Sequence, residues 1–513
     1  MKAVSILNDV LGPVMRGPSS SHTAGSFHIG RLARDLFGEE PSSATFVFDP
    51  GGSLAEVYRQ QGSDAAFTAG LIGLSIVDEH FTGALDIAEH RGLRVSFVVE
   101  PLPAADHPNA VEIRLEARDG RRLDVAAKSI GGGAVVVTRL GEWPVRLTGD
   151  AHELLVVVER ELEPVVRQRL VDTGRVLGEP TVHWQGRRAL LHLRLERPLS
   201  DDLAATLPEA QSIWTAAPVF FVPLGKPLFT SGADMVSLAE TRDLSLGQAA
   251  LAYESTLLGL PEDKVLAEVV RRFRVMRAAV QRGLEPYLPP MQLLHPTARR
   301  IYGAEARGRV GVGGLHTRAA ARAMAVMHVN AGMGLICAAP TAGSAGVIPG
   351  TVVTLVDEWE LGQEQAALAL LAASAIGLVV ATRASFAAEV AGCQVEIGAA
   401  GAMAAAAVVE LAGGTVQQAV DAAAISLQNT MGSTCDLVQG VVEIPCHTRN
   451  AVAASSAFVC ADLVLGGYFN PIPVDETIDA ALATGRMLPP QLRCTALGGL
   501  ATTPSARSMP RLR

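Results

Sequence analysis

Two long, uncharged stretches rich in small residues constrain this fold more than any other feature of the chain. Residues 331–356 contain no charged side chain, and residues 366–382 are almost entirely apolar. Prolines and glycines interrupt the first stretch, and the second is only about as long as one short membrane span. Because Ala, Gly, Ser and Thr outnumber Leu and Phe, we expect both stretches to be buried elements of a tightly packed domain.

The surrounding region, residues 224–513, is predicted to be mostly helical. Apolar residues recur at helical spacing in several segments, and their Ala and Gly content lets helices pack closely. The clearest segments are 246–260, 264–284, 320–333 and 399–414. We find no internal repeat and no low-complexity linker, so the region is expected to form one helical domain.

Residues 1–148 carry a mixed pattern. Segments rich in β-branched and aromatic residues predict strands, and amphipathic segments predict helices. The expected strands are 44–49, 93–100, 110–117, 123–130 and 134–140, and the expected helices are 25–37 and 63–74. This region is therefore predicted to be an α/β domain.

A third unit is predicted at residues 150–222. Its order of elements is strand, helix, strand, strand, helix, strand, which is the ferredoxin-like pattern. The strands are expected at 152–159, 180–185, 189–196 and 217–224, and the helices at 162–174 and 201–210. The chain as a whole is thus predicted to be a multidomain α+β protein with a mostly α-helical C-terminal domain.

The charge balance argues against several kinds of partner. The 513 residues include 43 basic and 52 acidic side chains, for a formal net charge of −9, and only 4% are aromatic. A nucleic-acid binder needs a basic face and often aromatic stacking platforms. We therefore expect no nucleic-acid partner. Because the opening residues lack the pattern of a signal peptide, we also expect a cytoplasmic protein with no membrane partner.

The six cysteines all lie beyond residue 336. Clustered cysteines in a large cytoplasmic chain indicate metal or redox chemistry rather than disulfides. Cys393, Cys435 and Cys446 are separated by 41 and then ten residues, which matches neither a ferredoxin nor a zinc finger. Three thiolates from separate segments can hold a [4Fe–4S] cluster and leave one iron open to substrate. Three buried, small apolar residues would explain the spacing equally well.

The segment 17–25, G-P-S-S-S-H-T-A-G, precedes a predicted helix. Backbone amides and hydroxyls of such a loop can hold a carboxylate, and a helix N-terminus also favours an anion. An ordinary helix N-cap at Ser20, Ser21 or Thr23 is the alternative explanation.

Nine segments taken together resemble the iron–sulfur-dependent L-serine dehydratases. They are residues 17–25, 62–66, 107–109, 129–133, 337–350, 392–398, 434–440, 443–451 and 492–504. The resemblance covers nearly the whole chain. It implies a β-type, substrate-binding-like domain at 1–148, an ACT-like domain at 150–222 and a catalytic α-type iron–sulfur domain at 224–513, fused in one chain.

The resemblance also implies roles for individual residues. In that family the cysteines of G-C-Q, T-C-D and P-C-x-x-R-N bind the cluster, which implies Cys393, Cys435 and Cys446 as metal ligands. His22 is implied as the catalytic residue. The implied substrate-binding residues are Ser19, Ser20, Ser21, Thr23, Gly62, Ser63, Asp64, Thr341, Gly343 and Ser344.

The family reaction converts L-serine to aminoacrylate, which falls to pyruvate and ammonia in amino-acid degradation. Hydroxide is a poor leaving group, so an iron bonded to the hydroxyl would help, and a base must take the α-proton. The implied cofactor is a [4Fe–4S] cluster and not pyridoxal phosphate. A pyridoxal enzyme needs a Schiff-base lysine, and no lysine follows Lys264.

Three departures from the family pattern bear on the substrate. Gln61 stands where G-H-G-T-D is common, and glutamine cannot act as a base, so His22 is predicted to handle the proton. Cys494 stands where a glutamate is usual; we interpret it as a buried thiol, with a spare cluster ligand as the alternative. Residues 287–303 replace a glycine-rich stretch.

Other functions fit the same residues. One is a related lyase acting on another small β-hydroxy or β-thiol amino acid. Another is a non-catalytic homologue that binds an amino acid or zinc. Because ACT-like units tend to pair through their sheets, we expect a homodimer. The family reaction implies a small amino-acid substrate.

Overall fold

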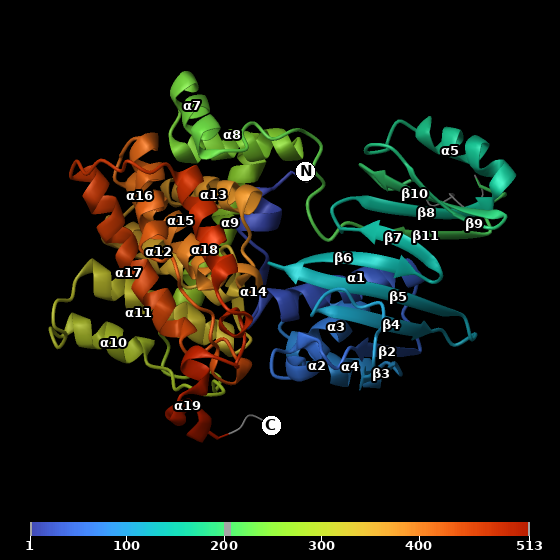
Figure 1. The fold of residues 1–513 in the computed structure, drawn as a ribbon, viewed down its shortest axis with the longest axis horizontal. Coiled ribbons are helices and arrows are strands. Elements are labelled where there is room, and N and C mark those ends of the chain that lie inside the picture. Colours follow the sequence, from blue (N-terminus) through green and yellow to red (C-terminus); the bar gives the residue numbers. More distant parts are fainter. Residues whose placement is uncertain (1–2, 200–206, 511–513) are drawn as a thin grey trace. The chain divides into compact units, whose positions relative to one another are not determined.

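The computed structural model describes residues 3–199 and 207–510. The chain divides into two compact units (Figure 1). Unit 1 contains the first twenty residues and everything from Gly225 onward, and unit 2 contains Ser21–Leu224. The opening segment therefore belongs with the C-terminal region and not with the sheet that follows it in sequence.

Unit 2 contains a six-stranded sheet with the order β3-β2-β4-β5-β6-β7. Its strands are β2 (Ser43–Phe48), β3 (Arg94–Val99), β4 (Ala110–Glu116), β5 (Arg122–Gly131), β6 (Ala134–Leu140) and β7 (Trp143–Leu147). The pair β2–β3 is parallel and every other pair is antiparallel. Five of these strands match the sequence prediction. The missed one, β7, is short and contains Pro144, which a sheet tolerates at an edge such as this one.

Helices α1 (Gly25–Phe37) and α3 (Ser63–Leu71) pack against each other, and α1 also contacts β5 and β6. Glycine allows this close crossing, because a Cβ added at Gly30 would lie 2.3 Å from the carbonyl oxygen of Phe67. The shorter helices of this part are α2 (Ser53–Val57), η3 (Phe81–Gly83) and α4 (Ala84–His90). The rings of Phe46 and Phe67, 4.7 Å apart between centroids, join the sheet to α3.

The second sheet of unit 2 has four antiparallel strands in the order β11-β8-β10-β9. Its elements are β8 (His152–Glu159), η4 (Arg160–Leu162), α5 (Glu163–Val171), β9 (Thr181–Gln185), β10 (Arg188–Leu195) and β11 (Ser212–Ala216). This strand order is that of the ferredoxin-like pattern. One face buries Leu154, Val156 and Leu193 against Val166 and Leu170 of α5. The first part of the helix predicted at 201–210, residues 201–206, lies outside the described residues.

The prediction of a last strand at 217–224 was wrong, because the strand ends at Ala216. Pro218 and Pro223 lack the N–H that a ladder needs. The N–H groups of Val219 and Phe220 both donate to the carbonyl oxygen of Gly149, at 2.9 and 3.0 Å. Phe220 instead packs edge-on against the His28 ring of α1, 4.9 Å away between centroids.

Unit 1 is mostly helical, as predicted. Its helices are α7 (Gly232–Arg242), α8 (Leu246–Leu258), α9 (Glu262–Gly283), α10 (Ala298–Ala306), α11 (Leu315–Ala331), α12 (Val347–Glu358), α13 (Gln363–Arg383), α14 (Ala388–Ala391), α15 (Ile397–Leu411), α16 (Val416–Gln428), α17 (Cys446–Leu465), α18 (Val474–Met487) and α19 (Pro504–Ser508). Helix α13 packs against α8, α9 and α15, and α11 packs against α12 and α17. Many contact positions are alanines, which lets these helices approach closely.

The two uncharged stretches are buried elements of this unit. Residues 331–356 break into β12 (Leu335–Cys337), η5 (Ala342–Ser344) and α12, while 366–382 lie inside α13. By length and composition alone, α13 and the segment Cys393–Leu411 could each cross a membrane. However, 78% and 83% of their most apolar windows are buried inside the structure, as in core helices.

Two buried charges hold the opening segment in unit 1. Glu254 of α8 accepts hydrogen bonds from the Ser5 hydroxyl at 2.5 Å and from the backbone N–H groups of Ile6 and Leu7 at 2.8 and 2.9 Å. Arg272 of α9 donates to the carbonyl oxygens of residues 7 and 11. After the turn η1 (Ile6–Val10), strand β1 (Val14–Arg16) pairs antiparallel with β12. The turn η2 (Ser20–Ala24) then leads into unit 2.

Candidate metal centre and substrate loops

Three separate segments of unit 1 bring cysteines together. Cys393 opens the turn η6 (Cys393–Val395) before α15, and its N–H donates to the carbonyl oxygen of Ser433 at 3.0 Å. Gly392 precedes it with a φ of 74° and lies so close that a Cβ would meet the same oxygen at 2.6 Å. This contact places Cys393 beside Cys435, two residues beyond Ser433. Cys446 is the first residue of α17.

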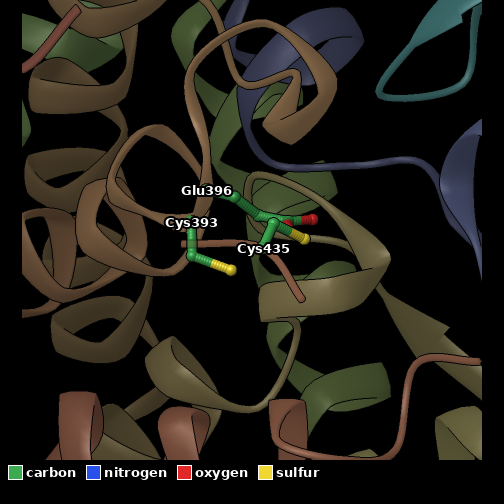
Figure 2. A group of neighbouring side chains, drawn as sticks. All are labelled: Cys393, Glu396 and Cys435. Atoms are coloured by element: carbon green, nitrogen blue, oxygen red, sulfur yellow. The ribbon is translucent and has the colours of Figure 1, made fainter. Parts of the chain in front are cut away.

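Figure 2 shows the Cys393 and Cys435 thiols and the Glu396 carboxylate close together. The two Sγ atoms and a carboxylate oxygen all lie within 4.8 Å of one another. The Cys446 thiol falls outside this group of three but interacts electrostatically with Cys393 and Glu396. All three cysteines are buried. The structure therefore brings the three predicted ligands into one region and adds a carboxylate.

The remaining cysteines separate into two groups. The Cys337 thiol lies 3.9 Å from the carbonyl oxygen of Leu11, at the β1–β12 pair. Cys460 sits on α17 and interacts with serine side chains of α16 and α17. Cys494, by contrast, lies beside Cys435: its N–H donates to the Cys435 carbonyl oxygen at 2.7 Å, and the two thiols are hydrogen-bonded.

Electrostatics around the thiols follow from burial. Hydrogen bonds to the Cys393 and Cys494 thiols, followed by burial, raise the pKa of Cys435. Burial raises the pKa of Cys446. In the metal-free chain the Cys435 and Cys446 thiols are therefore protonated at neutral pH, and metal binding must displace their protons.

Arg449 connects the cysteine segments with a positive charge. One guanidinium nitrogen lies 3.5 Å from the Cys393 Sγ and 2.6 Å from the carbonyl oxygen of Thr434, and the other donates to Asp436 at 2.9 Å. Asp436 also accepts the Leu500 N–H at 2.7 Å. A cation in this position favours thiolates and the negative charge of a thiolate-bound metal group.

Glu396 joins the thiols to the loop that sequence reasoning assigned to substrate. The Thr341 hydroxyl donates to its carboxylate at 2.6 Å. A Cβ at Gly343 would lie 2.6 Å from the same carboxylate, so a larger residue there would displace the Glu396 carboxylate. Burial raises the pKa of Glu396 to about 7, against the opposing effect of the Thr341 hydrogen bond. Sequence reasoning missed Glu396 although it lies within the quoted motif 392–398.

The same loop is fixed to its neighbours by two buried asparagines. Asn450 donates to the Gly343 carbonyl oxygen at 2.8 Å and accepts the Gly346 N–H at 3.1 Å. Asn330 donates to the carbonyl oxygens of Pro18 and Ala342 at 3.0 and 3.1 Å. Thr341 and Gly343 thus lie beside the Glu396 carboxylate, and Ser344 is hydrogen-bonded to Thr341. The segment that leads to Ser19 and Ser20 is held against the same loop.

Unit 2 gathers a second group of predicted residues. His22 Nε2 lies 2.9 Å from the Ser53 hydroxyl, and the Ser63 hydroxyl donates to the His22 carbonyl oxygen at 2.7 Å. The Thr23 hydroxyl donates to the Gln61 carbonyl oxygen at 2.9 Å. Burial lowers the pKa of His22 to about 4, so its imidazole is neutral at pH 7. Ser53 carried no sequence signal that singled it out.

The remaining predicted residues form the start of α3. Gly62 has a φ of 65°, in the left-handed region, and caps the helix that opens with Ser63 and Asp64. Burial raises the pKa of Asp64, against hydrogen bonds from backbone N–H groups. Ser21, His22 and Thr23 belong to unit 2, whereas Ser19 and Ser20 belong to unit 1. The chain therefore passes from one unit to the other within the predicted substrate motif.

The donor chemistry of unit 1 fits an iron–sulfur group. Thiolates are the ligands that such clusters and zinc prefer. His447, which follows Cys446, does not join this group; its ring packs against the His328 ring, 5.3 Å away between centroids. These features are consistent with a thiol-rich metal-cluster site in a helical unit.

Comparisons with known proteins identify the class. A profile of the family described as "Serine dehydratase alpha chain" matches residues 231–501. The probable L-serine dehydratase alpha chain of Bacillus subtilis is 39% identical over 282 residues, which cover 55% of this chain and 94% of that protein. The probable beta chain of the same organism is 43% identical over 149 residues, covering 29% of this chain and 66% of that protein.

One relative matches nearly from end to end. The L-serine dehydratase TdcG of Escherichia coli is 28% identical over 497 residues, covering 94% of this chain and 96% of that protein. Together with the profile, these matches show that the chain belongs to the L-serine dehydratase family. The resemblance inferred from the sequence motifs is thereby confirmed.

Proposed function

We propose that this protein is a lyase that converts L-serine to pyruvate and ammonia, using a [4Fe–4S] cluster. The observation that carries the proposal is the group formed by Cys393, Cys435 and Glu396, beside the loop of Thr341, in a chain of this family. Cys393, Cys435 and Cys446 are proposed to hold the cluster. When bound, the cluster would supply an iron that acts as a Lewis acid toward the serine hydroxyl.

The protein's own side chains would bind and orient the substrate. The Thr341 hydroxyl is fixed by Glu396, and Ser344 is fixed by its reciprocal hydrogen bonds with Thr341. A loop stiffened in this way would position a small amino acid without losing loop entropy on binding. We assign further substrate contacts to Ser19, Ser20, Ser21, Thr23, Gly62, Ser63 and Asp64.

His22 is proposed as the proton acceptor. Its buried, neutral imidazole can take the α-proton of serine, and the Ser53 hydroxyl at 2.9 Å holds the ring in place. Loss of the hydroxyl then gives aminoacrylate, which hydrolyses to pyruvate and ammonia. Gln61 is proposed to contribute hydrogen bonding only.

The proposed organisation follows the family resemblance. Residues 1–148 are assigned as the β-type domain, 150–222 as an ACT-like domain and 224–513 as the α-type catalytic domain. The strand order β11-β8-β10-β9 supports the middle assignment. A soluble, cytoplasmic homodimer is proposed with it, because exposed sheets of ACT-like units tend to pair.

The direct test compares anaerobically purified proteins in a coupled pyruvate assay. Wild type is expected to contain about four irons per chain and to release pyruvate from L-serine. Cys435→Ala should lose iron and activity together, as should Cys393→Ala and Cys446→Ala. Cys460→Ala serves as the matched control, because this buried cysteine lies away from the centre, and it should retain both.

Two results would redirect the proposal. Wild type that contains iron but releases product faster from another β-hydroxy or β-thiol amino acid would change the substrate. Wild type without iron that still releases pyruvate would refute the cluster mechanism.

A further inference from the structure

The C-terminal segment of unit 1 folds back onto the metal centre and brings a fourth cysteine with it. Cys435 and Arg493 form an isolated parallel bridge. The Cys435 N–H donates to the Leu492 carbonyl oxygen at 2.8 Å, and the Cys494 N–H donates to the Cys435 carbonyl oxygen at 2.7 Å. Two backbone hydrogen bonds thus hold residues 492–494 in register with a proposed cluster ligand.

Side-chain contacts show that Cys494 faces the centre. Its thiol is hydrogen-bonded to the Cys435 thiol. It also interacts electrostatically with Cys393, Cys446 and Glu396. Four of the six cysteines therefore converge on one region, and the other two, Cys337 and Cys460, lie elsewhere.

The backbone of Cys494 is held in an unusual conformation. Its φ is 60°, in the left-handed region that non-glycine residues rarely adopt. Such a conformation is disfavoured for a residue with a side chain and persists where surrounding contacts impose it. Here those contacts are the hydrogen bonds to Cys435. They hold the Cys494 side chain beside the Cys435 thiol.

The same segment is locked from its other side. Asp436, whose side chain is buried, accepts the Leu500 N–H at 2.7 Å while it is paired with Arg449 at 2.9 Å. A Cβ at Gly499 would lie 2.3 Å from an Asp436 carboxylate oxygen, so glycine is required there. The residues on both sides of Cys494 are therefore fixed to Cys435 and its neighbour.

We propose that Cys494 is a fourth thiolate ligand of the metal group held by Cys393, Cys435 and Cys446. This inference rests on the proposed function. It replaces the interpretation of Cys494 as a buried thiol with no part in the centre. In the substrate-free protein every iron of the cluster would then have a cysteine ligand.

Mössbauer spectroscopy of the ⁵⁷Fe-enriched, anaerobic, substrate-free protein tests the inference. Wild type should show four iron sites with similar parameters, as an all-cysteine cluster does. Cys494→Ala should show one iron that differs from the other three, a ratio of about 3 to 1. It should also lose iron to a chelator at least several-fold faster. Cys460→Ala should match wild type in both measurements.

The outcomes separate this inference from the function on which it rests. An iron-loaded wild type that already shows one distinct iron, with a spectrum equal to that of Cys494→Ala, would overturn the inference alone. A wild type without iron would overturn the proposed function and the inference with it. If Cys494→Ala fails to fold, judged by circular dichroism, the wild-type spectrum alone still decides between four equivalent irons and one distinct iron.

Discussion

Replacing Glu396 by glutamine should stabilise the metal-free protein at high pH and leave it almost unchanged at low pH. Burial raises the pKa of Glu396 from 4.5 to about 7. The contribution of Glu396 to the free energy of unfolding is therefore present below pH 4.5. It is lost as the pH rises through 7, because the folded state must then hold a buried carboxylate. A shift of this size corresponds to about 3 kcal/mol.

The glutamine variant keeps the shape and can still accept the Thr341 hydroxyl. Its free energy of unfolding should exceed that of wild type by about 3 kcal/mol at pH 8.5 and by under about 1 kcal/mol at pH 5. In melting temperature the gap at pH 8.5 should be about 5 °C. Urea unfolding of chelator-treated, reduced protein, followed by circular dichroism, measures it. Equal gaps at the two pH values would refute the reasoning, and Glu364→Gln, at an exposed site of α13, should show no gap at either.

Other expectations follow from the same structure. His22→Ala should lower turnover of L-serine by about 10²-fold or more without changing the iron spectrum, since it removes a proton acceptor; near-normal turnover would contradict this role. Gln61→His should be tolerated in the same assay. Burial lowers the pKa of His328 to about 4, so the folded protein loses stability as the pH falls from 6.5 toward 4. Over that range the free energy of unfolding of His328→Leu should fall by about 3 kcal/mol less than that of wild type. Thermal melts measure the difference, with His316→Leu as the control. Light scattering should detect a dimer, and a strictly monomeric species at all concentrations would count against it.

Much of the fold was readable from local patterns. Helix α1 and strand β8 begin and end at the residues predicted from the sequence. Strand β8 is a continuous apolar run that is buried on both faces. The segment 217–224 misled the prediction because its apolar residues contact α1 rather than a neighbouring strand. Periodicity records that a residue is buried and does not record which element buries it.

The site was less accessible to sequence reasoning. Motifs indicated Cys393, Cys435 and Cys446, and the structure places them in one region of unit 1. Glu396 lies in the same motif, yet only its contact with the Thr341 hydroxyl distinguishes it from an ordinary helix-start carboxylate. The approach of Cys494 to Cys435 depends on a chain reversal some 60 residues later, which no local pattern encodes.

Stepwise rebuilding of the cluster tests the central claim most directly. The purified protein is stripped of metal, and iron and sulfide are then added anaerobically with a reductant while pyruvate formation from L-serine is followed. The account predicts activity that rises in proportion to iron bound, reaches its maximum at about four irons per chain and disappears on exposure to air. Activity in the stripped protein, or activity restored by zinc or by pyridoxal phosphate in place of iron and sulfide, would contradict it.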